Sequence, residues 1–202
     1  MDAHEVPFGR WPSSVTPQML TEGAVGLVDV WLGEWRGAPA TVWLESRPSE
    51  AGRLQLVALG SDGEPHDLLP DGFSARSAVH EYGGGAAWVA GGSIWFVNWA
   101  DQRLHLLAAG GVPVPLTPEP DSPRALRYAD MRVSPEGQWI VCVRESHGDD
   151  VVNEIVALRA GRPSEPMVLF ALSLIHISEP TRLLSISYAG FCLHKKNRHP
   201  VL

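Results

Sequence analysis

The sequence predicts an all-β fold: a partial β-propeller of about three four-stranded blades with a short N-terminal helix. Between residues 25 and 171, short apolar or alternating runs are separated by turn residues, and the 20 Gly and 17 Pro of the chain agree with many turns. The pattern also repeats, because Leu68, Leu116 and Leu169 hold equivalent places and lie 48 and 53 residues apart. Four short strands in each repeat of roughly 40–50 residues are typical of propeller blades.

The first 24 residues are expected to form a lead-in segment that contains the helix. Thr16 is a good N-cap and Pro17 suits the first helical position, so a helix is predicted over residues 16–20, and Gly23 ends it soon afterwards.

The strands of the propeller, residues 25–171, fall into three sets. The first set is expected at 28–31, 41–45 and 53–57, closed by 66–70 after a hairpin turn at 61–64, and the chain is expected to be irregular at 33–39. The second set is expected at 86–90, 93–97, 103–107 and 114–118, and the third at 128–133, 139–143, 154–158 and 167–170.

The charge of the chain argues against a nucleic-acid surface. Residues 1–171 carry 12 Arg, no Lys and 22 Asp and Glu, whereas binding of phosphates needs concentrated basic residues. The chain contains no run of 18 or more apolar residues, so no membrane span is expected. The N-terminus also lacks the pattern of a secretory signal. Cys142 and Cys192 have neither metal-ligand spacing nor a disulfide framework. A bacterial cytoplasm is therefore expected, and the Arg-only usage resembles a GC-rich genome.

The composition changes abruptly at residue 172. Residues 172–202 have a net charge of +3, against −10 for residues 1–171, and hold both lysines, Lys195 and Lys196. Residues 172–182, 186–189 and 191–193 resemble, in order, the translation of a transposase-type sequencing adapter. We therefore interpret residues 172–202 as an adapter-derived, non-native tail that does not join the sheet; the alternative is a natural C-terminal segment.

A candidate site lies in the segment Arg-Ser-Ala-Val-His-Glu-Tyr-Gly-Gly-Gly, residues 76–85. Gly83, Gly84 and Gly85 allow a backbone turn with positive φ or a close approach to other groups. The polar side chains of His80, Glu81 and Tyr82 come directly before that turn. The simpler interpretation is a glycine-rich entry to a strand with a structural histidine.

Four stretches together resemble one family. They are the segment Val-His-Glu-Tyr-Gly-Gly-Gly (79–85), the opening at 12–17 and 26–30, the Val-Ser-Pro-Glu-Gly-Gln-Trp run (133–139) and the strand at 152–156, and the resemblance covers nearly all of residues 7–170. They resemble the N-terminal β-propeller of prolyl oligopeptidase-family serine peptidases, in particular bacterial acylaminoacyl peptidases and dipeptidyl aminopeptidases.

The resemblance implies a peptidase that hydrolyses short peptides through a Ser-His-Asp triad in an α/β-hydrolase domain after the propeller. The serine of that triad sits in a Gly-x-Ser-x-Gly turn, which this sequence lacks. The chain alone is therefore expected to be inactive, with peptide substrate and hydrolase domain as partners of the parent protein. The alternative is a standalone propeller that acts as a binding or adaptor module.

His80, Glu81 and Tyr82 could contact substrate or the hydrolase domain, with Glu81 offering a carboxylate to the amino terminus of a peptide. The alternative is that they make hydrogen bonds between blades. No catalytic residue, metal ligand or cofactor site is predicted, since the segment is neither His-Glu-x-x-His nor a phosphate loop. The acidic residues between 136 and 154 are interpreted as a solvated loop.

Overall fold

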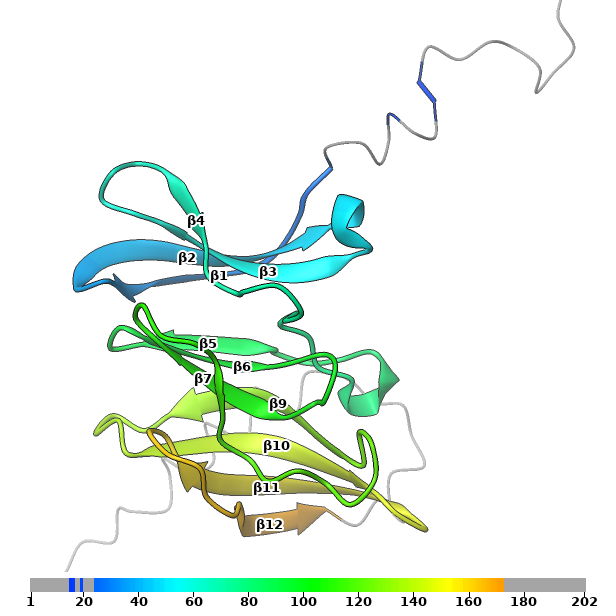
Figure 1. Ribbon diagram of the computed structural model, residues 1–202. Coiled ribbons are helices and arrows are strands. Elements are labelled where there is room, and N and C mark those ends of the chain that lie inside the picture. The colour runs from blue at the N-terminus through cyan, green and yellow to red at the C-terminus, as the bar shows by residue number, and fades with distance from the viewer. Residues whose placement is uncertain (1–14, 17–18, 20–23, 173–202) are drawn as a thin grey trace, which may run out of the picture. The chain divides into compact units, whose positions relative to one another are not determined.

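The computed structural model describes residues 15–16, 19 and 24–172, which include three antiparallel four-stranded sheets (Figure 1). The first holds β1 (Gly26–Trp35), β2 (Ala38–Arg47), β3 (Arg53–Leu59) and β4 (Pro65–Asp67). The second holds β5 (Ala87–Ala90), β6 (Ser93–Val97), β7 (Leu104–Ala108) and β8 (Val114–Pro115). The third holds β9 (Leu126–Val133), β10 (Trp139–His147), β11 (Val151–Arg159) and β12 (Met167–Leu172). Neighbours in each sheet follow chain order, as in propeller blades, so the predicted fold class is confirmed.

The first strands of the three blades are the inner ones. Among strands of different sheets, β1 approaches β5 and β5 approaches β9 most closely. Blades radiate from an axis, so the innermost strands of neighbouring blades come nearest to each other. All twelve strands lie in one compact unit that ends at Leu172.

Two apolar cores fill the spaces between the blades. Leu44, Leu56 and Phe96 are buried between the first and second blades. Tyr128 and Leu158 are buried in the core between the second and third. Each such side chain contributes about 1.5–3 kcal/mol to stability. The blades are therefore held mainly by nearest-neighbour packing.

The expected irregularity at residues 33–39 is wrong. β1 and β2 pair without interruption from Gly33 to the end of the hairpin, where Trp35 faces Ala38. The two turn residues, Arg36 and Gly37, both have positive φ, 53° and 78°. That geometry matches the right-handed twist of a two-residue hairpin, but Arg rarely adopts it, so the turn has no clear sequence signal.

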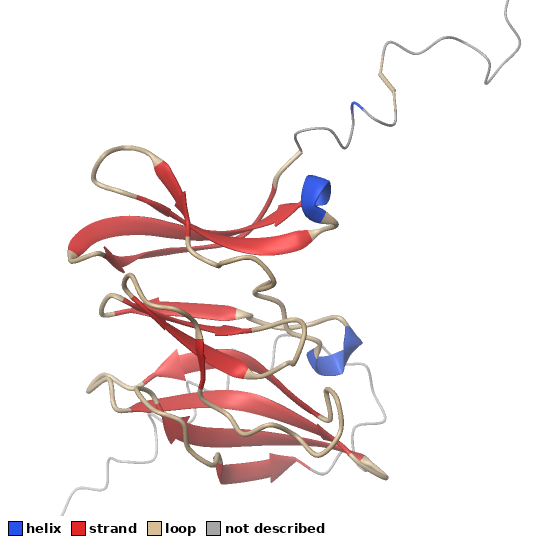
Figure 2. Cartoon of the chain, in the orientation of Figure 1, coloured by secondary structure: helices blue, strands red, loops and turns tan. Residues whose placement is uncertain are grey.

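The structure describes only part of the segment before β1 and ends at Leu172. The helix predicted over residues 16–20 lies mostly outside the described residues, although the Met19 amide donates to Thr16 Oγ1 at 3.1 Å. The backbone of Leu172 pairs with Asn153, so the expectation that residue 172 does not join the sheet is wrong. Between residues 24 and 172 the helical elements are two short 3-10 turns, η1 (Pro48–Glu50) and η2 (Val79–Glu81), and Met19 is also helical (Figure 2). No helix in the described part is long and apolar enough to cross a membrane.

Cys142 is expected to react with a thiol reagent on the order of 10³-fold more slowly in the folded chain than after unfolding at pH 8. Its side chain is 2% exposed in the second core, and burial raises the pKa of the thiol to about 12. The thiolate, which is the reactive form, is therefore scarce. Labelling of a Cys192→Ser variant with a chromogenic disulfide measures this, and equal rates with and without urea would contradict it.

Candidate functional site

The segment that the sequence singles out connects the first blade to the second and also touches the third. It leaves β4, forms the turn η2 and enters β5 (Figure 1). His80 and Glu81 both have positive φ, 54° and 65°, which is uncommon for residues other than glycine. Ser77 Oγ donates to the carbonyl of Tyr128 at 2.7 Å, and the Ala78 amide donates to Gln102 Oε1 at 2.7 Å. Hydrogen bonds from two blades thus fix the path of the segment.

The glycines after η2 are needed for two reasons. Gly83 has a φ of 91°, and a Cβ there would lie 3.0 Å from the carbonyl oxygen of Ser77. At Gly84 and Gly85 a Cβ would lie within 3.0 Å of Ala129 or Asp130. The amide of Gly85 donates to Asp130 Oδ1 and the amide of Asp130 donates to the carbonyl of Gly85, each at 2.8 Å. Gly83 therefore lets the segment turn beside Ser77, and Gly84 and Gly85 let the chain entering the inner strand of blade two approach that of blade three.

A buried carboxylate lies at the centre of the site. Glu145 belongs to β10 and is 2% exposed, and its Oε2 accepts from the backbone amide of His80 at 2.9 Å. The same oxygen lies 3.0 Å from His80 Nδ1. Its Oε1 lies 2.6 Å from His147 Nε2 and 3.5 Å from Arg127 Nη1. An ionised carboxylate only accepts, so both facing ring nitrogens must carry a proton.

Arg127 links Glu145 to the exposed edge of the segment. Its Nη1 donates to the carbonyl of Ala78 at 2.8 Å and also to the Glu81 carboxylate. The hydrogen bond from Arg127, followed by its charge, lowers the pKa of the Glu81 carboxyl. The Glu81–Arg127 pair therefore stabilises the fold above the ordinary carboxyl pKa, and this contribution is lost as the pH falls through the lowered value.

His80, Glu81 and Tyr82 are thus placed together but in different environments. The two charged partners of His80 and Glu81, namely Glu145 and Arg127, both come from the third blade. Tyr82 is 76% exposed, and its ring centroid lies 5.9 Å from that of His80. Hydrogen bonds between blades therefore exist here, while the Tyr82 side chain faces solvent.

Sequence reasoning missed Glu145 and Arg127. Glu145 was included in the acidic group interpreted as a solvated loop, and that interpretation is wrong for this residue. It is also wrong for Glu154, a strand residue whose carboxylate accepts from Arg144 Nε at 2.8 Å. The alternation of β10 gives no signal for Glu145, because this residue lies on the same side of the strand as the exposed Val141 and opposite to the core residue Cys142. Its partner His80 lies 65 residues away.

A cleft lies beside this cluster, and we call it the arginine cleft. It has a volume of about 390 Å³. Its lining comes from the β4–β5 and β8–β9 connections and the hairpin ends of blades two and three: Ala78, Glu81, Trp99, Ser122, Pro123, Arg124, Ala125, Arg127 and His147. Arginine, histidine and glutamate meet here, so the cleft can bind charged groups.

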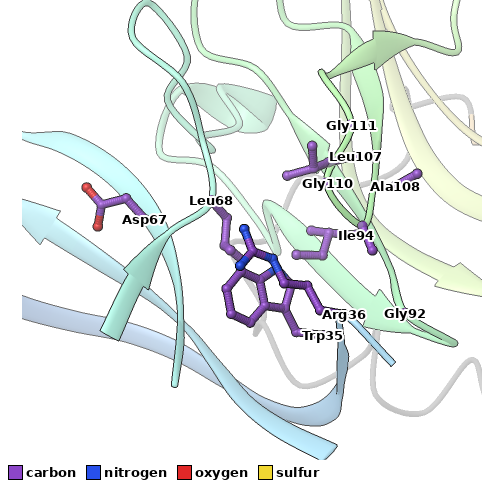
Figure 3. A pocket seen from close by; sticks show the side chains of 11 residues that line it. Trp35, Arg36, Asp67, Leu68, Gly92, Ile94, Leu107, Ala108, Gly110 and Gly111 are labelled. Atoms are coloured by element: carbon purple, nitrogen blue, oxygen red, sulfur yellow. The ribbon is translucent and has the colours of Figure 1, made fainter. Parts of the chain in front are cut away.

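A second cavity, of about 230 Å³, lies between the first two blades near the β1–β2 hairpin (Figure 3). Arg36 lies over Trp35, with its Cζ 4.3 Å from the ring centroid, and Ile94 and Leu107 lie across the cavity. Its carboxylate, Asp67, accepts two hydrogen bonds of 2.6 Å from Arg47. Aliphatic side chains and glycines make up most of the rest of the lining, so this cavity has few groups that could bind a polar ligand or catalyse a reaction. The described residues contain no group of three His, Cys, Asp or Glu that could hold a metal ion.

The described residues form a partial β-propeller that is similar to part of solved peptidase structures. No protein-family model and no curated protein matches the chain. Among solved structures, a puromycin-hydrolysing peptidase of Mycobacterium tuberculosis matches 83% of this chain with 34% identity and a TM-score of 0.72. A puromycin hydrolase matches 78% with 29% identity and a TM-score of 0.65.

The resemblance to the propeller of prolyl oligopeptidase-family peptidases is confirmed by these matches. The chain spans 28% and 25% of the length of these two proteins. That share is consistent with an N-terminal propeller fragment.

Proposed function

We propose that the three blades are the N-terminal part of the propeller of a serine peptidase that hydrolyses peptide bonds in short peptides. The similarity to a puromycin-hydrolysing peptidase, 34% identical over 83% of this chain, carries the proposal. In this proposal the triad is supplied by an α/β-hydrolase domain of the parent protein, which is bacterial and cytoplasmic. Residues 1–24 form its lead-in, residues 25–171 its incomplete propeller, and residues 172–202 are adapter-derived.

The segment around η2 is proposed to face substrate or the hydrolase domain. Tyr82 is exposed there, and the Glu81 carboxylate is 77% exposed although Arg127 binds it. The Glu81 carboxylate could therefore bind a peptide amino group in place of part of its hydrogen bonding to Arg127. The hydrogen bonds to the third blade would hold the segment in place for that contact.

The 202-residue chain is expected to show no turnover of aminoacyl or acylaminoacyl p-nitroanilides or of puromycin. The reason is that no Gly-x-Ser-x-Gly turn occurs in its sequence, so it lacks the nucleophile of the proposed mechanism. Chromogenic assays and labelling by a fluorophosphonate probe measure this. Activity or labelling that follows this chain through purification would contradict the prediction.

Resequencing the source DNA beyond the codon of Phe170 tests the proposal itself. A reading frame that continues through further blades to a Gly-x-Ser-x-Gly motif would support it. A frame that ends after a few more blades would instead favour a standalone adaptor. Recovery of the codons of residues 172–202 from that DNA would show that the tail is natural.

A further inference from the structure

Arg124 differs from the other arginine of the arginine cleft. Arg127 is neutralised by Glu81 and Glu145, with which it forms ion pairs. The Arg124 guanidinium forms no ion pair or hydrogen bond with any described residue, and its Nε is buried without a partner. The buried Nε–H is an unsatisfied donor, whereas the Arg124 side chain as a whole is only half-buried. The cleft therefore has an unused cationic donor in its wall.

Trp99 holds the Arg124 guanidinium in place. The Cζ atom of Arg124 lies 4.2 Å from the centroid of the indole ring, and that of Arg76 lies 4.3 Å from it. Stacking on a ring occupies the face of a guanidinium and leaves the N–H groups at its edge free to donate. Two arginines on one indole also raise the local positive potential of an otherwise acidic chain.

The surroundings of Arg124 carry charges of both signs. The exposed Glu81 carboxylate lines the same cleft. On its other side Arg124 borders a hollow that is also lined by Asp101, Glu119 and Asp121. These carboxylates, with Arg103 among them in the hollow, offset part of the attraction that the arginines exert on an anion. Ala78, Ala125 and Pro123 provide apolar wall for the rest of a ligand.

We propose that the arginine cleft binds the carboxylate of a short peptide, with the guanidinium edge of Arg124 as the donor. The volume of about 390 Å³ suits a ligand of a few residues. That the carboxylate belongs to a peptide rests on the proposed function, whereas the carboxylate site rests on Arg124 and Trp99 alone. Arg124 would be a specificity residue for the free carboxyl end of the ligand.

Saturation-transfer NMR titrations of the soluble fraction of the full chain, whether monomeric or oligomeric, with N-acetyl-Gly-Gly test this site, with N-acetyl-Gly-Gly-amide as the uncharged control. We expect the acid to bind and the amide to bind at least tenfold more weakly. Arg124→Gln should weaken binding of the acid at least tenfold. Arg162→Gln, which removes the same charge from an exposed loop, should leave it within twofold.

Other results would overturn the inference. Equal binding of acid and amide, or unchanged affinity in Arg124→Gln, would show that the guanidinium does not hold the ligand. If acetate binds as tightly as the peptide acid, the claim that the ligand is a peptide is wrong. If inorganic phosphate binds more tightly than the peptide acid, the claim that the site prefers a carboxylate is wrong. Circular dichroism of each variant shows whether a loss of binding comes from a loss of folding. Arg124→Lys, which keeps the charge, serves as a second variant for the same purpose. Because this experiment measures binding and not catalysis, it can confirm the carboxylate site even if the parent protein proves not to be a peptidase.

Discussion

Replacing Glu145 by alanine is expected to lower the free energy of unfolding by about 3–5 kcal/mol, because it breaks a buried charge cluster. The carboxylate is 2% exposed and faces Arg127 and two histidines. Without it, the two histidines and the amide of His80 lose their acceptor, while Arg127 keeps the Ala78 carbonyl and Glu81. Since Glu145 lies in blade three and His80 in the link to blade two, the contact between these blades should weaken most.

Urea unfolding at one fixed protein concentration, followed by circular dichroism, measures the effect of Glu145→Ala. Glu136→Ala is the matched control, because Glu136 is an exposed turn residue and its loss should change stability by less than about 0.5 kcal/mol. Glu145→Gln keeps the size of the side chain and one acceptor, so an intermediate loss is expected. A loss in Glu145→Ala no larger than in Glu136→Ala would mean that the cluster does not hold the blades together.

The strands could be predicted because their signals are local. The alternation in Arg53–Leu59 and the apolar run in Ser93–Val97 identify strands without knowledge of the fold. The repeat of such runs then predicts blades. The Arg36–Gly37 hairpin escaped this reasoning because Arg adopts a conformation that local preferences disfavour.

The candidate site could be predicted only in part, because its contacts join distant residues. The glycines at 83–85 indicated a close approach, but Asp130, the residue approached, lies 45 positions away from Gly85. Glu145 resembles its acidic neighbours in sequence, and only the packing of the blades shows that it is buried. Charge alone does not distinguish a solvated carboxylate from one that holds two blades together.

Both outer faces of the described blades carry exposed apolar side chains. Trp31 and Trp35 of β1 pack on the core, and successive strand residues point to opposite faces, so Val30 and Leu32 point away from the second blade. Val30 is 61% and Leu32 86% exposed, and Phe170 on β12 is 57% exposed. Propeller blades normally pack such faces against a neighbour.

The sequence alone predicts exposure of Trp88, Trp95, Val141 and Val143, and this is wrong for Trp95. Trp95 lies in the middle blade, is 6% exposed, and donates from Nε1 to the carbonyl of Ala160 at 2.8 Å. Trp88 also packs against the second core. Val141 is 36% exposed, in agreement with its place on the outer face of blade three.

The chain expressed alone is expected to form oligomers or to be insoluble, because exposed apolar sheet faces drive association. Size-exclusion chromatography with light scattering measures this. Leu32→Lys with Phe170→Lys should shift the soluble protein toward the monomer, since it places a charge on each face. Val112→Lys is the control, because Val112 is 73% exposed in the β7–β8 loop, outside both faces. A sharp peak at the monomer mass of 22.0 kDa for the unmodified chain, with cooperative unfolding, would contradict the prediction.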